Sequence, residues 1–119
     1  MKTRYSLKMQ IIGSLAAILI FNAPAMAFAE SEGEKLFKSN RPAEAILFLE
    51  DEIKSGTASS AAYNYLGLAY YQTGDYQNSV DAFAKGLKVP ATNKKVLSYN
   101  QGNSYYAMGD YENAAKSYT

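Results

Sequence analysis

The stretch LAYYQTGDYQNSVDAFAKG, residues 68–86, decides the fold, because the chain repeats it 35 residues later as NSYYAMGDYENAAKSYT, residues 103–119. When residues 67–84 are set against 102–119 without a gap, seven of eighteen positions are identical. A fainter copy lies at 33–53, at a spacing of 34 residues. Three units with a period of 34–35 residues indicate a repeat array rather than one conventional core.

Each unit has the pattern of two helices joined by a tight turn. Thr73-Gly74-Asp75 interrupts the pattern, since glycine adopts the left-handed conformation that ends a helix and Asp75 can accept hydrogen bonds from the first amides of the next helix. Apolar residues recur at spacings of three and four on both sides of this break. They are Tyr63, Leu66, Gly67 and Tyr70 before it, and Val80, Phe83, Ala84 and Leu87 after it.

Small residues predict how closely the helices pack. Gly67 and Ala69 in the first helix, and Ser79 and Ala82 in the second, allow helix axes to approach while larger rings fill the space beside them. Ten of the eleven tyrosines lie within 63–118. Their expected role is core packing, with the hydroxyl group at the rim.

The second unit resembles the tetratricopeptide repeat family. The matching residues are Tyr63-x-x-Leu66-Gly67-x-x-Tyr70, Ser79-x-x-x-Phe83 and Pro90. The third unit departs from the family pattern at Ser98 and Gln101. The resemblance covers 30–119 and implies an all-α, right-handed superhelical stack of antiparallel helix hairpins. It has about two and a half repeats, in units of about 30–56, 59–90 and 93–119.

The resemblance also implies a function, because proteins of this family hold a peptide or helix of a partner protein against the concave wall built from the first helices. Tyr71 and Tyr106 are the main expected contacts, and the alternative is that they only pad the groove floor. The partner-binding positions carried over from the family are Asn64, Leu68, Tyr71, Gln72, Tyr99, Asn103 and Tyr106, flanked by Glu34, Phe37, Lys38 and Val96.

The composition of the groove bears on the kind of partner. In one variety of this fold, lysine, arginine and asparagine grip a partner's C-terminal carboxylate, but only Asn100 fits that set here. The other positions of the set hold Glu30, Glu34, Tyr65 and Val96. A groove of amides and aromatic rings favours a neutral or mildly basic segment instead.

Catalysis is not expected. The chain has no histidine and no cysteine, which excludes thiol catalysis, a Ser-His-Asp relay and the usual zinc sites. The side chains of the run Glu50-Asp51-Glu52 point in different directions on a helix, so they do not converge on one metal ion. The run therefore predicts a solvated face rather than a metal site. We expect no catalytic residue, no metal and no cofactor.

The N-terminus predicts export. Lys2, Arg4 and Lys8 precede an uncharged stretch at 11–21, and Ala-x-Ala steps follow, as in a secretory signal peptide spanning 1–29. Cleavage is expected after Ala27 or Ala29, which would place the mature protein in the periplasm of a bacterial envelope or outside the cell. The alternative is a membrane anchor formed by uncleaved 11–21.

The remaining 30–119 has nine basic and eleven acidic residues, a balance of −2, so neither nucleic acid nor anionic lipid is an expected partner. No membrane insertion is expected after signal cleavage. The third unit stops at Thr119, within its second helix, which leaves Ala114, Ala115 and Tyr118 uncovered. Either the chain is a fragment of a longer protein or this end docks on another chain. The second option gives an alternative function, a structural module that self-associates through its uncapped C-terminal repeat.

Overall fold

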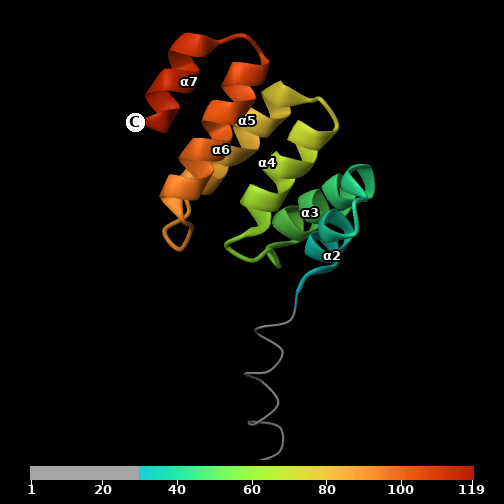
Figure 1. Ribbon diagram of the computed structural model, residues 1–119. Coiled ribbons are helices and arrows are strands. Elements are labelled where there is room, and N and C mark those ends of the chain that lie inside the picture. The colour runs from blue at the N-terminus through green and yellow to red at the C-terminus, as the bar shows by residue number, and fades with distance from the viewer. Residues whose placement is uncertain (1–29) are drawn as a thin grey trace, which may run out of the picture. The chain divides into compact units, whose positions relative to one another are not determined.

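The computed structural model describes residues 30–119, and this part of the chain consists of helices without any strand (Figure 1). The helices are α2 (Glu32–Lys38), α3 (Pro42–Ser55), α4 (Ala62–Gln72), α5 (Tyr76–Leu87), α6 (Lys94–Ala107) and α7 (Tyr111–Tyr118). The predicted all-α stack of helix hairpins is confirmed. The predicted signal peptide, 1–29, lies outside the described residues. Within 30–119, no helix combines the length and the apolar character that a membrane span requires.

The turn inside each hairpin is built as the sequence predicts. Gly74 and Gly109 have φ angles of 80° and 79°, and Asn40 takes the same place in the first hairpin with φ 60°. Left-handed backbone of this kind ends the first helix, and glycine and asparagine adopt it at low cost. In the first hairpin, Pro42 then starts α3 at a position where its missing N–H is not needed.

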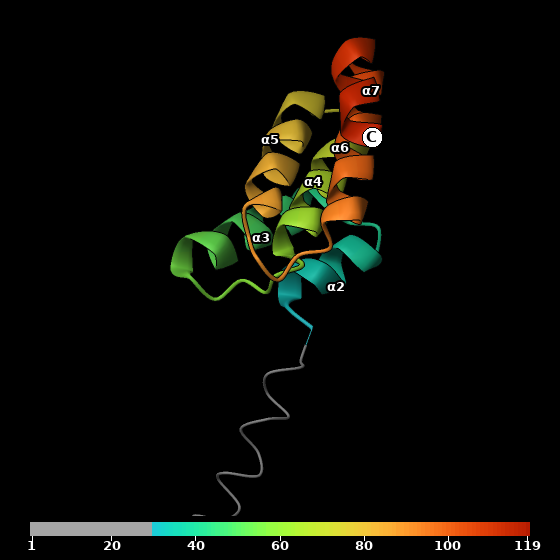
Figure 2. The same cartoon turned by 90° about the vertical axis from the view of Figure 1, so that its left-hand side faces the viewer.

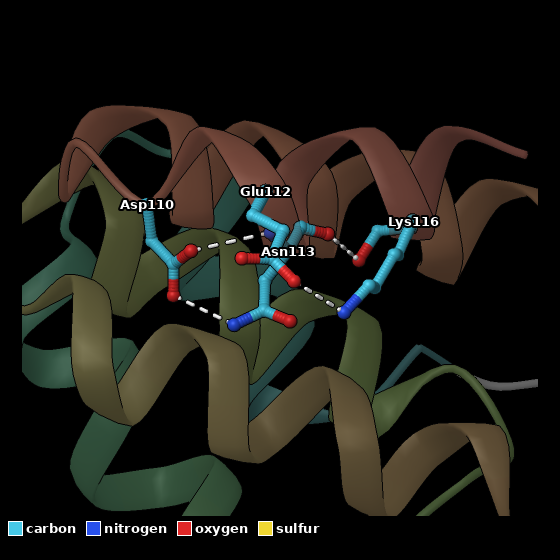
Figure 3. Close-up of polar contacts among 5 residues, drawn as sticks. Asp110, Glu112, Asn113 and Lys116 are labelled. Atoms are coloured by element: carbon cyan, nitrogen blue, oxygen red, sulfur yellow. Dashed lines mark hydrogen bonds and ion pairs between the residues drawn. The ribbon is translucent and has the colours of Figure 1, made fainter.

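The second helix of the later hairpins begins at an aspartate cap. Asp75 accepts a hydrogen bond from the backbone N–H of Asn78 at 3.3 Å and another from its side-chain amide at 2.7 Å. Asp110 and Asn113 repeat both bonds, at 3.2 and 2.7 Å, as Figure 3 shows. These two bonds, the side-chain one first, hold the pKa of the Asp110 carboxyl below its usual value.

One contact holds the two helices of every hairpin together. A Cβ atom built on Gly33, Gly67 or Gly102 would lie 2.5 Å from a side chain of the second helix, which is closer than real contacts allow. The side chains that occupy these places are Leu49, Phe83 and Tyr118, at the repeat spacing. The glycine in each first helix therefore makes room for one large side chain from the helix that follows.

Neighbouring hairpins meet through small residues. At the first junction, Ala45 of α3 and Ala69 of α4 are both fully buried in one cluster with Leu49 and Leu66. At the second junction the equivalent pair is Ser79 and Ser104, whose hydroxyl oxygens lie 2.7 Å apart in the interior. Small side chains at these places let α4 and α6 lie close against the preceding hairpin.

The contacts between helices define an inner and an outer wall. The first helices of the hairpins, α2, α4 and α6, contact one another in order, whereas no Cα atom of α3 lies within 8 Å of α5, and none of α5 lies within 8 Å of α7. The first helices are therefore the more closely spaced row and form the inner wall of the stack in residues 31–119. Figures 1 and 2 show α4 and α6 side by side, from two directions.

Candidate functional site

The residues that sequence analysis assigned to the groove lie on α4 and α6, two of the three inner-wall helices. Three of them, Tyr71, Tyr99 and Tyr106, expose 39%, 60% and 61% of their surface, which is high for rings of this size. The asparagines Asn64 and Asn103 are half-buried. Aromatic surface and amide groups thus occur together on this wall.

Two of the exposed rings are held by a second tyrosine across the hairpin turn. Tyr71 packs on Tyr76 with ring centroids 5.3 Å apart, and Tyr106 packs on Tyr111 at 5.0 Å, both in tilted geometry. Tilted aromatic pairs at such distances are favourable beyond the area they bury. Each exposed ring is therefore held in place by its neighbour. Sequence analysis missed the supporting rings, although their 35-residue spacing was visible.

The amide side chains are also held by neighbours. Asn100 Nδ2 donates to Asn64 Oδ1 at 2.9 Å, which links α6 to α4. Asn103 Oδ1 accepts a hydrogen bond from the Tyr118 hydroxyl at 2.7 Å, and Tyr118 in turn packs on Tyr99 at 5.6 Å. Asn100 was considered only as part of a carboxylate clamp, so sequence analysis missed its contact with Asn64.

A small pocket opens between α4 and α6, with a volume of about 100 Å³. It is lined by Leu68, Tyr71, Phe83, Asn100 and Asn103. Three of the predicted groove residues therefore come together here. The other four do not line this pocket: Asn64 supports it through Asn100, Tyr99 and Tyr106 lie elsewhere on α6, and Gln72 is exposed at the end of α4.

A larger cavity of about 680 Å³ lies between α6 and α7, but its position is explained by helix length. In the second hairpin, Gly86 in the last turn of α5 lies against Tyr63. Ser98, the equivalent of Tyr63, lines the larger cavity, and α7 has 8 residues where α5 has 12. The cavity thus occupies the space that the last turn of α5 fills one hairpin earlier, and we do not assign it to the groove.

Comparison with known families agrees with the repeat geometry. Two profiles described as Tetratricopeptide repeat match the chain, one over residues 30–93 and one over residues 97–119. The chain belongs to the tetratricopeptide repeat family. Tetratricopeptide repeats are protein–protein interaction scaffolds in general, and proteins built from them are typically non-enzymatic. No curated protein matches the chain significantly.

The tetratricopeptide domain has one tyrosine with a strongly shifted pKa, and its role is structural. Burial, followed by a hydrogen bond to Glu50, raises the pKa of Tyr70 to about 12. This bond ties α4 to α3 and leaves the hydroxyl group neutral across the physiological range. Within 30–119, no three residues among His, Cys, Asp and Glu gather closely enough to hold a metal ion.

Proposed function

We propose that this protein is an exported scaffold that binds an extended segment of a partner protein along the inner wall of α2, α4 and α6. The observation that carries the proposal is the pair of buttressed tyrosines, Tyr71 on Tyr76 and Tyr106 on Tyr111, exposed on the same wall as the half-buried asparagines. Rigid aromatic side chains supply contact area at low entropic cost, and amides bond to peptide backbone. The partner segment is neutral or mildly basic.

The test is capture of a partner from envelope extracts by the full chain and by a double variant, Tyr71→Ala with Tyr106→Ala. We expect the double variant to lose the captured partner, because both groove rings are removed. The matched control is Leu47→Ala with Phe48→Ala, since these side chains on α3 are 67% and 47% exposed and lie off the inner wall. Capture that survives in the groove variant, or disappears in the control, would contradict the proposal.

Export is proposed from the sequence of 1–29 alone. We expect signal cleavage after Ala27 or Ala29, which intact mass spectrometry of protein from the periplasmic fraction would reveal as a single shortened species. Recovery of the full-length chain in the membrane fraction would favour the alternative, an anchor through uncleaved 11–21.

A second candidate function is self-association through a surface that Tyr106 of α6 shares with α7. A shallow cavity of about 380 Å³ there is lined by Tyr106, Tyr111, Ala114, Ala115 and Tyr118. The expectation that Ala114 lies uncovered is wrong, because α6 and α7 bury it to 2% exposure, but Ala115 and Tyr118 are exposed. Light scattering over a range of concentrations tests this function, and monomers at every concentration would exclude it.

A further inference from the structure

The turn between α6 and α7 carries an exposed pair of tyrosines. Tyr106, near the end of α6, and Tyr111, at the start of α7, expose 61% and 62% of their surface, and their ring centroids lie 5.0 Å apart. Carbon atoms of two rings at this separation are close to van der Waals contact, which is about 3.5–4.0 Å. No hydrogen bond within residues 30–119 involves either hydroxyl group. Two unbonded phenol groups are therefore held side by side in solvent.

Tyrosine is the residue of this chain that one-electron oxidants attack. The chain has eleven tyrosines but no cysteine, tryptophan or histidine. Removal of one electron and one proton from a phenol leaves a phenoxyl radical, whose unpaired electron is shared with the two ring carbons next to the hydroxyl-bearing carbon, Cε1 and Cε2. A second phenoxyl radical in contact with the first reacts at these carbons. The packing of the rings therefore decides which tyrosines become joined.

The same pair occurs one repeat earlier, but it is less open to an oxidant. Tyr71 and Tyr76 occupy the positions equivalent to Tyr106 and Tyr111, with centroids 5.3 Å apart. Tyr71 exposes only 39% of its surface, and Tyr76 is half-buried. A shallow cavity of about 380 Å³ opens beside the later pair and gives small molecules access to both of its rings. Of the two equivalent pairs, the later one is the closer and the more exposed.

A third pair is held in a way that hinders coupling. The rings of Tyr99 and Tyr118 lie 5.6 Å apart. Cε1 of Tyr118, one of its two coupling carbons, lies against Gly102, and its hydroxyl group donates to Asn103 Oδ1 at 2.7 Å. This ring therefore has one coupling carbon covered and its phenol engaged in a hydrogen bond.

We propose that Tyr106 and Tyr111 form an oxidative modification site, at which hydrogen peroxide acting through a haem peroxidase joins the two rings as dityrosine. Each phenol gives up one electron and one proton, and the two radicals combine in a carbon–carbon bond between a Cε atom of one ring and a Cε atom of the other. The hydrogen on each bonded carbon leaves as a proton while each oxygen regains one, which restores both phenols. The two electrons and two protons reduce one hydrogen peroxide to two waters.

The bond ties the start of α7 to the end of α6. Among the described helices, α7 contacts only α6, and Tyr111 is its first residue. A cross-link removes open conformations of the segment it closes, so the third hairpin opens less readily. Amides of α7 should therefore exchange with solvent more slowly in the oxidised chain. The reaction requires neither the proposed partner protein nor export of the chain.

The experiment treats a dilute solution of the full chain with a haem peroxidase and hydrogen peroxide and follows dityrosine fluorescence. Digestion with trypsin and an Asp-N protease then assigns the link, because cleavage before Asp110 separates Tyr106 from Tyr111. The two tyrosines fall in peptides 96–109 and 110–116. We expect mass spectrometry to find these two peptides joined, with the loss of two hydrogen atoms, in chains that remain single on a denaturing gel.

The key variant is Tyr111→Phe, which keeps a ring packed on Tyr106 and removes the phenol. The joined peptides should be absent from this variant, and the slowing of α7 exchange after oxidation should be lost with them. The matched control is Tyr76→Phe in the second hairpin, which should form the link between α6 and α7 as the unaltered chain does. A circular dichroism spectrum of Tyr111→Phe like that of the unaltered chain shows that the loss of the link does not come from loss of the fold.

Three results would overturn the assignment. The first is a link that forms faster between Tyr71 and Tyr76, or between Tyr99 and Tyr118, which the digestion places in peptide 117–119. The second is addition of oxygen to Met108 as the main product, since this side chain is 42% exposed in the same turn and two-electron oxidation converts methionine to its sulfoxide. The third is coupling only between separate chains, with no link inside one chain.

Discussion

At the scale of single residues, the three glycines of the first helices govern how closely each hairpin closes. Each of these glycines lies against one large side chain of the second helix, but these side chains differ in how much space they have to move. Phe83, opposite Gly67, is fully buried, whereas Tyr118, opposite Gly102, is 44% exposed. A buried ring has no space to move into, and an exposed ring can turn toward solvent. The same substitution should therefore have different costs at the two sites.

We predict that Gly67→Ala destabilises the fold by about 1–3 kcal/mol, because the new methyl group overpacks a core ring. Gly102→Ala should cost less, since Tyr118 can move aside and alanine favours a helix over glycine by about 1 kcal/mol. Urea unfolding followed by circular dichroism measures both. Equal losses of unfolding free energy would show that the freedom of the opposing ring does not decide the cost.

A second prediction at this scale concerns the cap of α7. The pKa of Asp110 is lowered mainly by the side-chain hydrogen bond from Asn113, then by its backbone N–H, with Lys116 a smaller cause. Because the folded-state pKa lies below the unfolded one, the stabilisation is present above the unfolded value, about 3.9, and is lost as the pH falls through the folded value. Asn113→Ala should move the pKa back toward that value in carboxyl NMR titrations.

The control for the cap is Lys116→Gln, which removes a nearby positive charge. In the unaltered chain, Lys116 Nζ lies 2.8 Å from a carboxylate oxygen of Glu112, a pair that is drawn in Figure 3. This variant should raise the pKa of Asp110 less than Asn113→Ala does. A larger effect from Lys116→Gln would mean that charge attraction, rather than the asparagine cap, sets the pKa.

At the scale of helices, the two junctions use different chemistry at the same place. The first has the apolar pair Ala45 and Ala69, and the second has the hydroxyl pair Ser79 and Ser104. Ser79 Oγ donates to the carbonyl oxygen of Gly67 at 2.6 Å and lies 2.7 Å from Ser104 Oγ, which is also 3.2 Å from the carbonyl oxygen of Asn100. This short chain of hydrogen bonds joins α6 to both helices of the second hairpin.

We predict that Ser79→Ala alone costs about 1 kcal/mol, because it leaves a buried carbonyl oxygen and the Ser104 hydroxyl with poorer partners. Adding Ser104→Ala should cost little more, since the double variant reproduces the alanine pair of the first junction. A double-mutant cycle on unfolding free energies gives the coupling between the two sites. Strictly additive costs would show that the hydroxyl pair does not act as a unit.

The sequence predicted the hairpins well because their determinants are local. The determinants of a hairpin, such as Gly74, Asp75 and the small residues, lie within about a dozen positions of each other. The same pattern occurs in two units of the sequence. The pocket was not predictable in the same way. It depends on how Asn100 and Asn103 of the third hairpin lie against Leu68 and Tyr71 of the second, which no local pattern shows. The burial of Ala114 was missed because this residue was expected to need a further hairpin as cover, whereas α6 alone covers it.

At the scale of the whole described domain, stability is distributed along a line rather than around one core. Each hairpin contacts only its neighbours in the chain, so each junction contributes separately. α4 contacts α2, α3, α5 and α6, whereas α7 contacts only α6 among the described helices. In the first hairpin, the position of Ala69 and Ser104 is occupied by Lys35, which is exposed.

The linear arrangement predicts graded protection of backbone amides from hydrogen exchange. The slowest amides should lie in α4 and α5, and those of α7 should exchange at least about tenfold faster, because local opening needs less free energy where fewer neighbours are broken. Leu97→Ala at the second junction, where the side chain is 1% exposed, sharpens the test. This substitution should reduce the protection of amides in α6 and α7. It should leave the protection of amides in α2 and α3 almost unchanged, because these helices do not take part in the second junction. Equal loss of protection in all six described helices would show that the domain opens as a single cooperative unit, and the account of separate junctions would then fail.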